Sequence, residues 1–166
     1  MNSTLIEMVW PNQVTQSDNN RVDRQTGELL IEALQQVDLN DLDSVYELCQ
    51  PYLNEQQLVE LETHWYDRHP VLAWSNHNDI VQLTDYSMLF LEAHQQHHCV
   101  LTYRHELESQ EYAIFKVLHP ERATLGIERQ PYKQRYQLDQ LVAANNQPVR
   151  TTTRHFVLRW LRQAQP

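Results

Sequence analysis

The spacing of apolar residues changes near the middle of this chain, and that change restricts the folds open to it. Up to about residue 98, apolar side chains recur every three or four positions, which is the spacing of one face of an α-helix. Beyond that point, apolar and polar side chains alternate over short runs, as they do in half-buried β-strands. The sequence therefore predicts an α+β fold in which N-terminal helices pack on one face of a C-terminal antiparallel sheet.

Helical spacing predicts three helices in the first half of the chain. The first opens at Thr26. Asn40 or Asp41 begins the second and Asn54 begins the third, because such side chains accept hydrogen bonds from the free amides of a first helical turn. The third helix ends before Pro70, since the residue that precedes a proline is disfavoured in the α region.

The segment 79–97 allows two interpretations. In the first, a short strand over Ile80–Leu83 is followed by a helix that Thr84 or Asp85 caps and that runs to residue 97. In the alternative, Ser87–Leu91 is a buried strand, because a short apolar run does not distinguish helix from strand by its period. We favour the helix, since the residues Glu92–Gln96 prefer that conformation.

The second half is predicted to form strands joined by short turns. Its strongest signal is a hairpin that pairs Val100–His105 with Tyr112–Leu118 about a turn at 108–110. The remaining predicted elements are the strands Ala123–Arg129 and Tyr132–Tyr136, a brief helix Leu138–Ala144, and a long threonine-rich final strand Val149–Leu161.

A chain of 166 residues is expected to form one domain. We predict an N-terminal arm or loop over residues 1–25, where the chain is mostly polar, and a single α+β domain over residues 26–166. The start of the chain has no secretory signal, and no apolar run approaches the roughly 18 residues of a membrane helix. A cytoplasmic location without membrane contact is therefore expected.

The charges of the chain are divided between its two halves. The formal net charge is −9, yet residues 1–100 carry 16 acidic and 3 basic side chains, whereas residues 101–166 carry 6 acidic and 10 basic ones. The overall charge argues against a general nucleic-acid binder, which normally has a basic surface. The arginines near the end, interleaved with aromatic residues, could contact RNA, but the net charge of −9 favours contact with protein or pairing within the chain. Those arginines are Arg150, Arg154, Arg159 and Arg162, and the aromatic residues are Tyr132, Tyr136, Phe156 and Trp160.

An acidic surface is predicted on the polar faces of the first helices. Its members, which we assign as candidate partner-binding residues, are Asp38, Asp41, Asp43 and Glu47. Complementary charge raises association rates and selects partners, so the expected partner is a basic protein. The alternative is that these carboxylates only keep the helices in water.

Two groups of residues have side chains of the kinds that bind metals or catalyse proton transfer. His94, His97 and His98 fall at helical spacing and, with Cys99 or His105, include enough nitrogen and sulfur ligands for a metal. The chain has no HExxH pattern, and histidines also suit the negative end of a helix dipole, so we predict a polar helix end and assign no metal and no cofactor.

The second group lies at the end of the third predicted helix. There, His69 and Asp67 have the side chains of an acid–base pair, but the helix pattern favours an amphipathic helix end. Only two glycines occur, so phosphate-binding loops built on several glycines are excluded. No nucleophile motif is present, and no catalytic residue is assigned.

These observations favour a non-enzymatic protein-binding module that uses an acidic helical face. An immunity-type or antitoxin-like inhibitor and a secretion chaperone both fit this description. The alternative is a small-molecule-binding or enzymatic α+β cup with histidine, aspartate and tyrosine in a pocket between helix and sheet.

Overall fold

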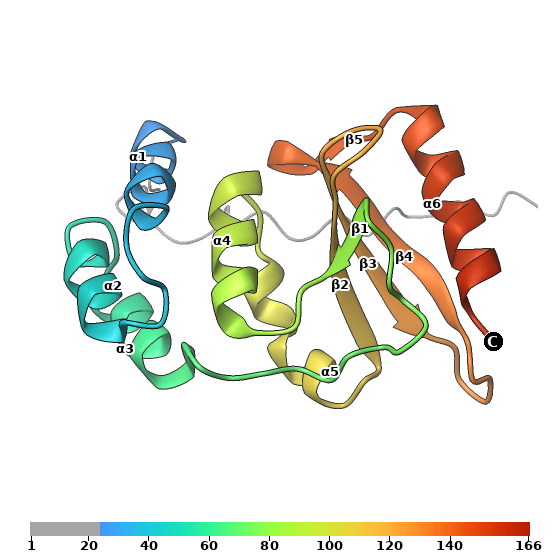
Figure 1. Cartoon of the computed structure of the whole chain (residues 1–166), viewed down its shortest axis with the longest axis horizontal. Helices are drawn as coiled ribbons and strands as arrows, with labels where there is room; N and C mark the ends of the chain where they lie inside the picture. The colour runs from blue at the N-terminus through green and yellow to red at the C-terminus, as the bar shows by residue number, and fades with distance from the viewer. Residues whose placement is uncertain (1–23) are drawn as a thin grey trace, which may run out of the picture.

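The computed structural model describes residues 24–166, which form an antiparallel sheet with helices on both faces (Figure 1). The predicted arm over residues 1–25 therefore lies almost wholly outside the described residues, and the first helix begins at Arg24. The helices are α1 (Arg24–Leu34), α2 (Leu42–Cys49), α3 (Glu55–His64), α4 (Tyr86–Gln96), α5 (Arg104–Glu108) and α6 (Thr151–Ala164), with short 3-10 turns η2 (Val100–Tyr103) and η3 (Ala144–Asn146). The strands are β1 (Ile80–Gln82), β2 (Tyr112–Val117), β3 (Ala123–Arg129), β4 (Tyr136–Ala143) and β5 (Gln147–Pro148).

The sheet has the simplest antiparallel order, because its five strands follow one another as β1-β2-β3-β4-β5. Phe115 on β2 lies opposite Gln82 on β1 and Leu125 on β3. The register between β3 and β4 shifts between Gly126 and Ile127. Strands that are neighbours in sequence are thus also neighbours in the sheet, and the five strands form one layer.

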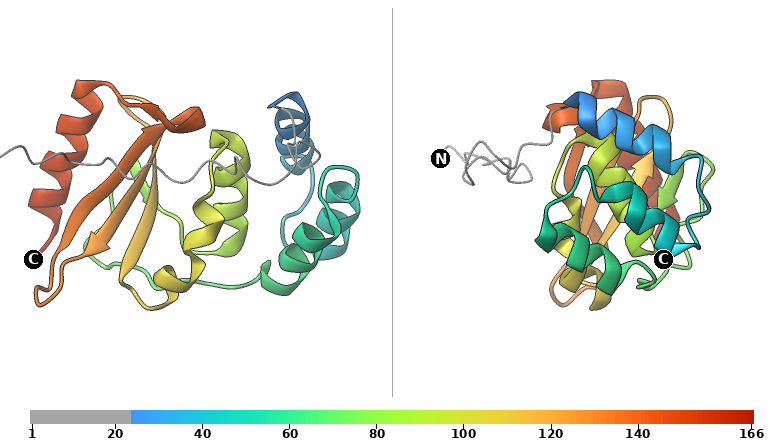
Figure 2. Two further views of the ribbon diagram at one scale, coloured as in Figure 1. Left: turned by 180° about the vertical axis from the view of Figure 1, so that it is seen from behind. Right: turned by 90° about the vertical axis from the view of Figure 1, so that its left-hand side faces the viewer.

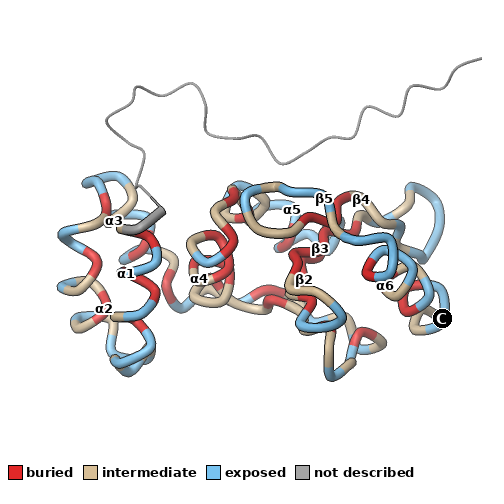
Figure 3. Tube along the Cα trace, turned by 90° about the horizontal axis from the view of Figure 1, so that it is seen from above, coloured by how far each residue is buried: buried red, intermediate tan, exposed pale blue. Residues whose placement is uncertain are grey.

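The helices are arranged in layers along the long axis of the molecule (Figures 1, 2 and 3). On one face of the sheet, Leu89 of α4 and Leu107 of α5 share a core with Ile114 of β2. On the other face, α6 packs Val157 and Trp160 against the sheet. The helices α1 to α3 form a further core with the outer side of α4.

This arrangement confirms the predicted α+β fold with N-terminal helices on one face of an antiparallel sheet. No helix in residues 24–166 has the length and the apolar character that crossing a membrane requires.

The predicted helix starts are confirmed where a capping side chain was visible in the sequence. Asp41 accepts from the amide of Ser44 at the start of α2. Asn54 and Gln57 form a reciprocal capping box at α3. Asp85 accepts from the amide of Met88 at α4, so the helical interpretation of the segment that follows β1 is the correct one.

The hairpin predicted for Val100–His105 is wrong. These residues form η2 and the start of α5. Val100 is fully buried, and the ring of Tyr103 stacks on that of Tyr112 with 4.8 Å between centroids. The alternation was too short to decide between strand and helix, and the packing of this connection beneath α4 favours the tighter turns.

The final strand predicted over Val149–Leu161 is also wrong, because α6 occupies that position. The threonine run suggested a strand, but Thr153, Val157 and Leu161 are buried at a spacing of four residues, which is one face of a helix. A distant side chain binds the polar groups at the start of α6. Glu121 accepts hydrogen bonds from the Arg150 amide at 2.8 Å and from the Thr153 hydroxyl at 2.9 Å.

The elements between β3 and α6 also differ from their predictions. The predicted helix Leu138–Ala144 lies mostly within strand β4. The predicted strand Tyr132–Tyr136 is instead the turn that joins β3 to β4, apart from its last residue. Pairing with β3 supplies the hydrogen bonds of β4, and such long-range pairing often overrides local preference.

Candidate functional site

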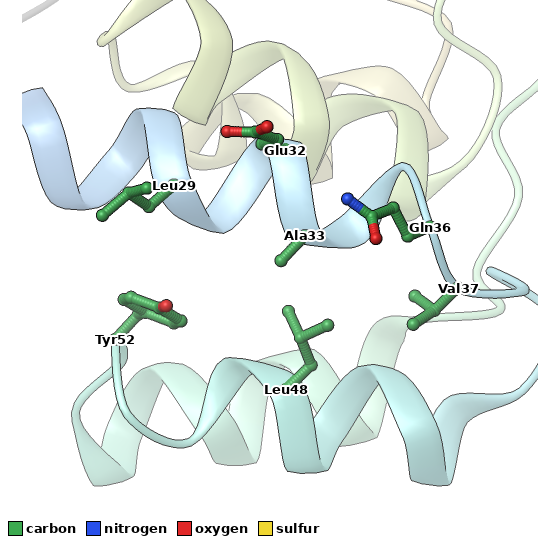
Figure 4. A pocket seen from close by; sticks show the side chains of 7 residues that line it. All are labelled: Leu29, Glu32, Ala33, Gln36, Val37, Leu48 and Tyr52. Atoms are coloured by element: carbon green, nitrogen blue, oxygen red, sulfur yellow. The ribbon is translucent and has the colours of Figure 1, made fainter.

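An open groove of about 520 Å³ lies between α1 and α2, which are at the end of the molecule away from the sheet (Figure 1). Its floor is apolar: Leu29 and Ala33 of α1 face Leu48 of α2 and Tyr52 (Figure 4). Leu29 keeps 49% of its surface exposed. The full lining is Leu29, Glu32, Ala33, Gln36, Val37, Leu48 and Tyr52. An exposed apolar strip with polar residues at its edge is the kind of surface that proteins use for contact.

The groove arises from the amphipathic sequences of its two helices. On α1, Leu30 and Leu34 point into the core against α4, while Leu29 and Ala33 are left on the outer side. On α2, the buried residues are Val45 and Cys49, which leaves Leu48 next to the groove. Each helix therefore has more apolar surface than its own core covers.

The surroundings of the groove are strongly acidic. Residues 24–64, which include α1, α2 and α3, carry nine acidic side chains and one basic side chain. Glu32 lies at the edge of the groove itself. The structure places all four acidic residues predicted for partner binding, Asp38, Asp41, Asp43 and Glu47, on exposed positions of α2 and of the connection before it.

Three of these four carboxylates also have local structural roles. Asp38 accepts from the backbone amide of Asn40 at 2.9 Å. The Ser44 hydroxyl donates to Asp41 at 2.6 Å, and this bond lowers the pKa of the Asp41 carboxyl. Asp43 lies in the first turn of α2, where negative charge is favoured by the helix dipole. Glu47 is exposed in the last turn of α2, so local structure gives the least reason for its charge.

A second hollow of about 290 Å³ lies where α1 meets α4 and η3. Its lining includes Glu28, Glu32, His94, His97 and Asn145. His97 ends α4 in the left-handed conformation, with φ of 54°, a position that glycine usually takes. Both hollows therefore lie along α1, and Glu32 belongs to both.

The three histidines predicted as possible metal ligands have different surroundings. The His94 ring bonds to the Phe90 carbonyl at 2.8 Å, and burial lowers the pKa of His94. The Nε2 atom of His98 is 2.7 Å from the Thr124 hydroxyl. Within residues 24–166, no three histidine, cysteine, aspartate or glutamate side chains form a group that could hold a metal ion.

The second predicted group, around His69, lies outside the two hollows described above. His69 is only 5% exposed, and neither ring nitrogen has a hydrogen-bond partner among the described residues. Burial lowers the pKa of His69. Asp67 instead accepts from His64 Nδ1 at 2.7 Å. None of these three residues lines either of the two hollows described above.

The structure shows a buried polar network that the sequence did not reveal. Glu92 of α4 is 2% exposed. Its carboxylate accepts hydrogen bonds from both terminal guanidinium nitrogens of Arg122, at 3.0 Å from Nη1. The Thr124 hydroxyl on β3 also donates to Glu92. Because that bond uses its one proton, the hydroxyl oxygen accepts from Nε2 of His98. Burial lowers the pKa of His98 to about 4, which fits a neutral ring that donates from Nε2. The network joins α4 to the sheet.

This network had a weak sequence signal. Glu92 stands between Leu91 and Ala93 on a mainly apolar helix, and a lone charge there requires a partner. Arg122 lies 30 positions away, and no spacing rule connects the two. Its position between layers indicates a structural role rather than a reactive one.

The family described as PcfJ-like protein matches residues 7–157, which is most of the chain. The chain belongs to the PcfJ-like family. No curated protein and no solved structure matches it.

Proposed function

We propose that this PcfJ-like chain is a non-enzymatic protein-binding module whose acidic helical end receives a basic, amphipathic segment of a partner protein. The observation that supports the proposal best is the α1–α2 groove, which combines an open apolar floor with a strongly acidic surround. An inhibitor of a basic protein and a secretion chaperone would both use such a surface.

The shape of the groove favours a helical segment. A shallow apolar strip between two helices can bind the apolar face of a third helix, whose apolar side chains recur at every third or fourth position. Leu48 and Tyr52 line one wall at a spacing of four residues, as Leu29 and Ala33 line the other. Residues on one face of an incoming helix would meet both walls at once.

The charges favour a basic segment over an acidic one. With nine acidic side chains against one basic in residues 24–64, an acidic helix would be repelled during its approach, whereas a basic helix would be attracted. Attraction between exposed charges weakens as salt is added. The apolar floor would still contribute at high salt, so binding should decrease but not vanish.

The proposal is tested with a defined probe. A fluorescein-labelled amphipathic helical peptide of leucine and arginine is titrated with the protein, and its anisotropy is measured in 50 and in 500 mM NaCl. A peptide with glutamate in place of every arginine serves as the charge control. We expect the basic peptide to bind at least tenfold more tightly than the acidic one in 50 mM NaCl.

The site is tested with matched variants. Glu32→Lys combined with Glu47→Lys should weaken the basic peptide about tenfold at low salt, since exposed pairs contribute up to about 1 kcal/mol each. Glu60→Lys combined with Glu62→Lys on α3 changes the net charge equally and should have the smaller effect. Equal effects of the two pairs would show that only the overall charge matters, which would contradict a site at the groove.

A further inference from the structure

The turn between β3 and β4 holds an aromatic side chain in an unusual state. Tyr132 has a φ of 64° and a relative exposure of 107%. A non-glycine residue in the left-handed region pays a conformational cost, and a fully exposed ring gains nothing from burial. Burial within the described part of the chain therefore does not offset the conformational cost at Tyr132. Strained backbone positions of this kind often occur at functional sites.

The rest of the turn holds Tyr132 in place. The Gln130 amide donates to the Arg135 carbonyl at 2.8 Å, and the Lys133 amide donates to the Gln130 carbonyl at 3.2 Å. Arg129 donates from its guanidinium to the Gln134 side chain at 3.2 Å. These bonds close the turn upon itself and hold the backbone from which the exposed Tyr132 ring projects, which reduces the ordering that a partner must supply.

The turn is also basic throughout. Arg129, Lys133 and Arg135 are exposed, and residues 129–135 contain no acidic side chain. The C-terminal end of α6 lies beside the turn (Figure 1), where Arg135 donates to the Pro166 carbonyl at 3.3 Å. Residues 150–166 add four arginines and no acidic residue. The end of the molecule opposite the acidic groove is therefore a basic surface with one projecting ring.

We propose that this surface, defined by Arg129, Tyr132, Lys133 and Arg135, binds single-stranded nucleic acid. A projecting ring gives an unpaired base a face on which to stack, and the flanking cations match the phosphates on either side. The net charge of −9 averages over two ends of opposite charge, because the acidic segment that holds α1 to α3 and the basic segment that holds α6 lie at opposite ends of the molecule (Figure 3).

A strand of nucleic acid fits this surface better than an acidic protein does. An acidic protein surface would pair with the cations alone and would leave the exposed ring without a flat partner, whereas every base has one. Duplex nucleic acid fits less well, because its bases are already stacked on each other. Its major groove is read by a whole helix or β-ribbon rather than by one tyrosine ring. The proposal concerns the end opposite the groove and does not depend on the proposed function.

The test uses fluorescein-labelled oligonucleotides of 20 thymidines and 20 uridines and a 20-base-pair duplex, titrated with the full chain in 50 mM NaCl. We expect both single strands to bind and the duplex to bind more weakly. Tyr132→Ala should weaken the single strands about five- to thirtyfold, and Tyr132→Phe should keep wild-type affinity, since stacking needs the ring and not the hydroxyl.

Two further variants separate binding from folding and from overall charge. Tyr132→Gly removes both the ring and the conformational cost, so it should bind as weakly as Tyr132→Ala while the urea midpoint stays equal or rises. Lys133→Glu should weaken binding and lower its salt dependence. Arg68→Glu, an exposed position in the segment after α3, makes the same charge change and should have little effect.

Three results would overturn the proposal. The first is an absence of single-strand binding in 50 mM NaCl at 100 μM protein. The second is equal affinity of the wild type and Tyr132→Ala. The third is salt-dependent self-association of the wild type, lost in Lys133→Glu and unaffected by oligonucleotide, which would assign this surface to the acidic end of a second copy.

Discussion

The ion pair between Glu92 and Arg122 is expected to couple the helical half of the chain to the sheet. Removing one member of a buried ion pair costs about 3–5 kcal/mol, because it leaves a charge without a partner. Arg122→Met leaves the carboxylate of Glu92, which is 2% exposed, with the Thr124 hydroxyl alone. Since 32% of the Arg122 side chain is exposed, water reaches the pair from that side, and we expect about 3 kcal/mol.

The opposite change should cost less. Glu92→Gln keeps one oxygen as an acceptor for Arg122 and Thr124, and Arg122 reaches water, so we expect about 1–2 kcal/mol. The double variant has no stranded charge, and we expect it to lose about 2 kcal/mol rather than the sum. A coupling free energy of about 2–3 kcal/mol follows.

The assay is urea unfolding at pH 7, followed by tryptophan fluorescence and by circular dichroism. All four proteins should remain folded without urea, since domains of this size have unfolding free energies of about 5–15 kcal/mol. The slopes of the transitions should agree, so that midpoints report stability. Single losses that add within about 0.5 kcal/mol in the double variant would refute the reasoning.

Three other predictions concern the same fold. Gly126→Ala should lower the unfolding free energy by about 1–3 kcal/mol, as measured with urea, because an added methyl group meets the Tyr112 ring; an unchanged midpoint would contradict this. Glu121→Ala should cost about 0.5–2 kcal/mol, and because bonds from the Arg150 amide lower the pKa of Glu121, the difference from wild type should be present at pH 7 and disappear on acidification below about pH 4. His98 has its pKa lowered to about 4, so the unfolded chain binds more protons and stability should fall from pH 6.5 to pH 4; His98→Gln should flatten this slope by up to about 3 kcal/mol over the interval, and parallel pH profiles would oppose it.

The sequence predicted those parts of the fold whose signals are local. The side chains of Asp41, Asn54 and Asp85 cap helices, and each is visible as a polar residue ahead of an apolar pattern. The α+β class followed from the change in apolar spacing, which depends on the whole of each half and tolerates errors in single elements.

The elements that the sequence misassigned depend on distant residues. The start of α6 is capped by Glu121, about thirty positions earlier in the chain. The threonines of α6 favour a strand by local preference, and this distant contact stabilises the helix instead. Strand β4 is held by its pairing with β3. In both cases long-range contacts decided against local preference.

The candidate site also has parts that local sequence predicted and parts that depend on distant residues. Asp43 and Glu47 were identified as exposed acidic residues because a polar helix face shows in the sequence. The groove was not predicted, since it needs Leu29 and Leu48 from two helices at a set separation. Tyr132 was noted only as an aromatic residue near cations, because neither its φ nor its exposure can be read from sequence.

The location of a bound basic segment is the most direct test of the proposed protein-binding function. The ¹⁵N-labelled protein is titrated with the leucine–arginine peptide, and amide chemical shifts are followed. We predict that the shifts concentrate on α1 and α2, with Ala33, Leu48 and Tyr52 among the largest, and that α6 is unaffected. Shifts absent at saturating peptide, or spread evenly over the acidic residues of the whole chain, would contradict a binding groove between α1 and α2.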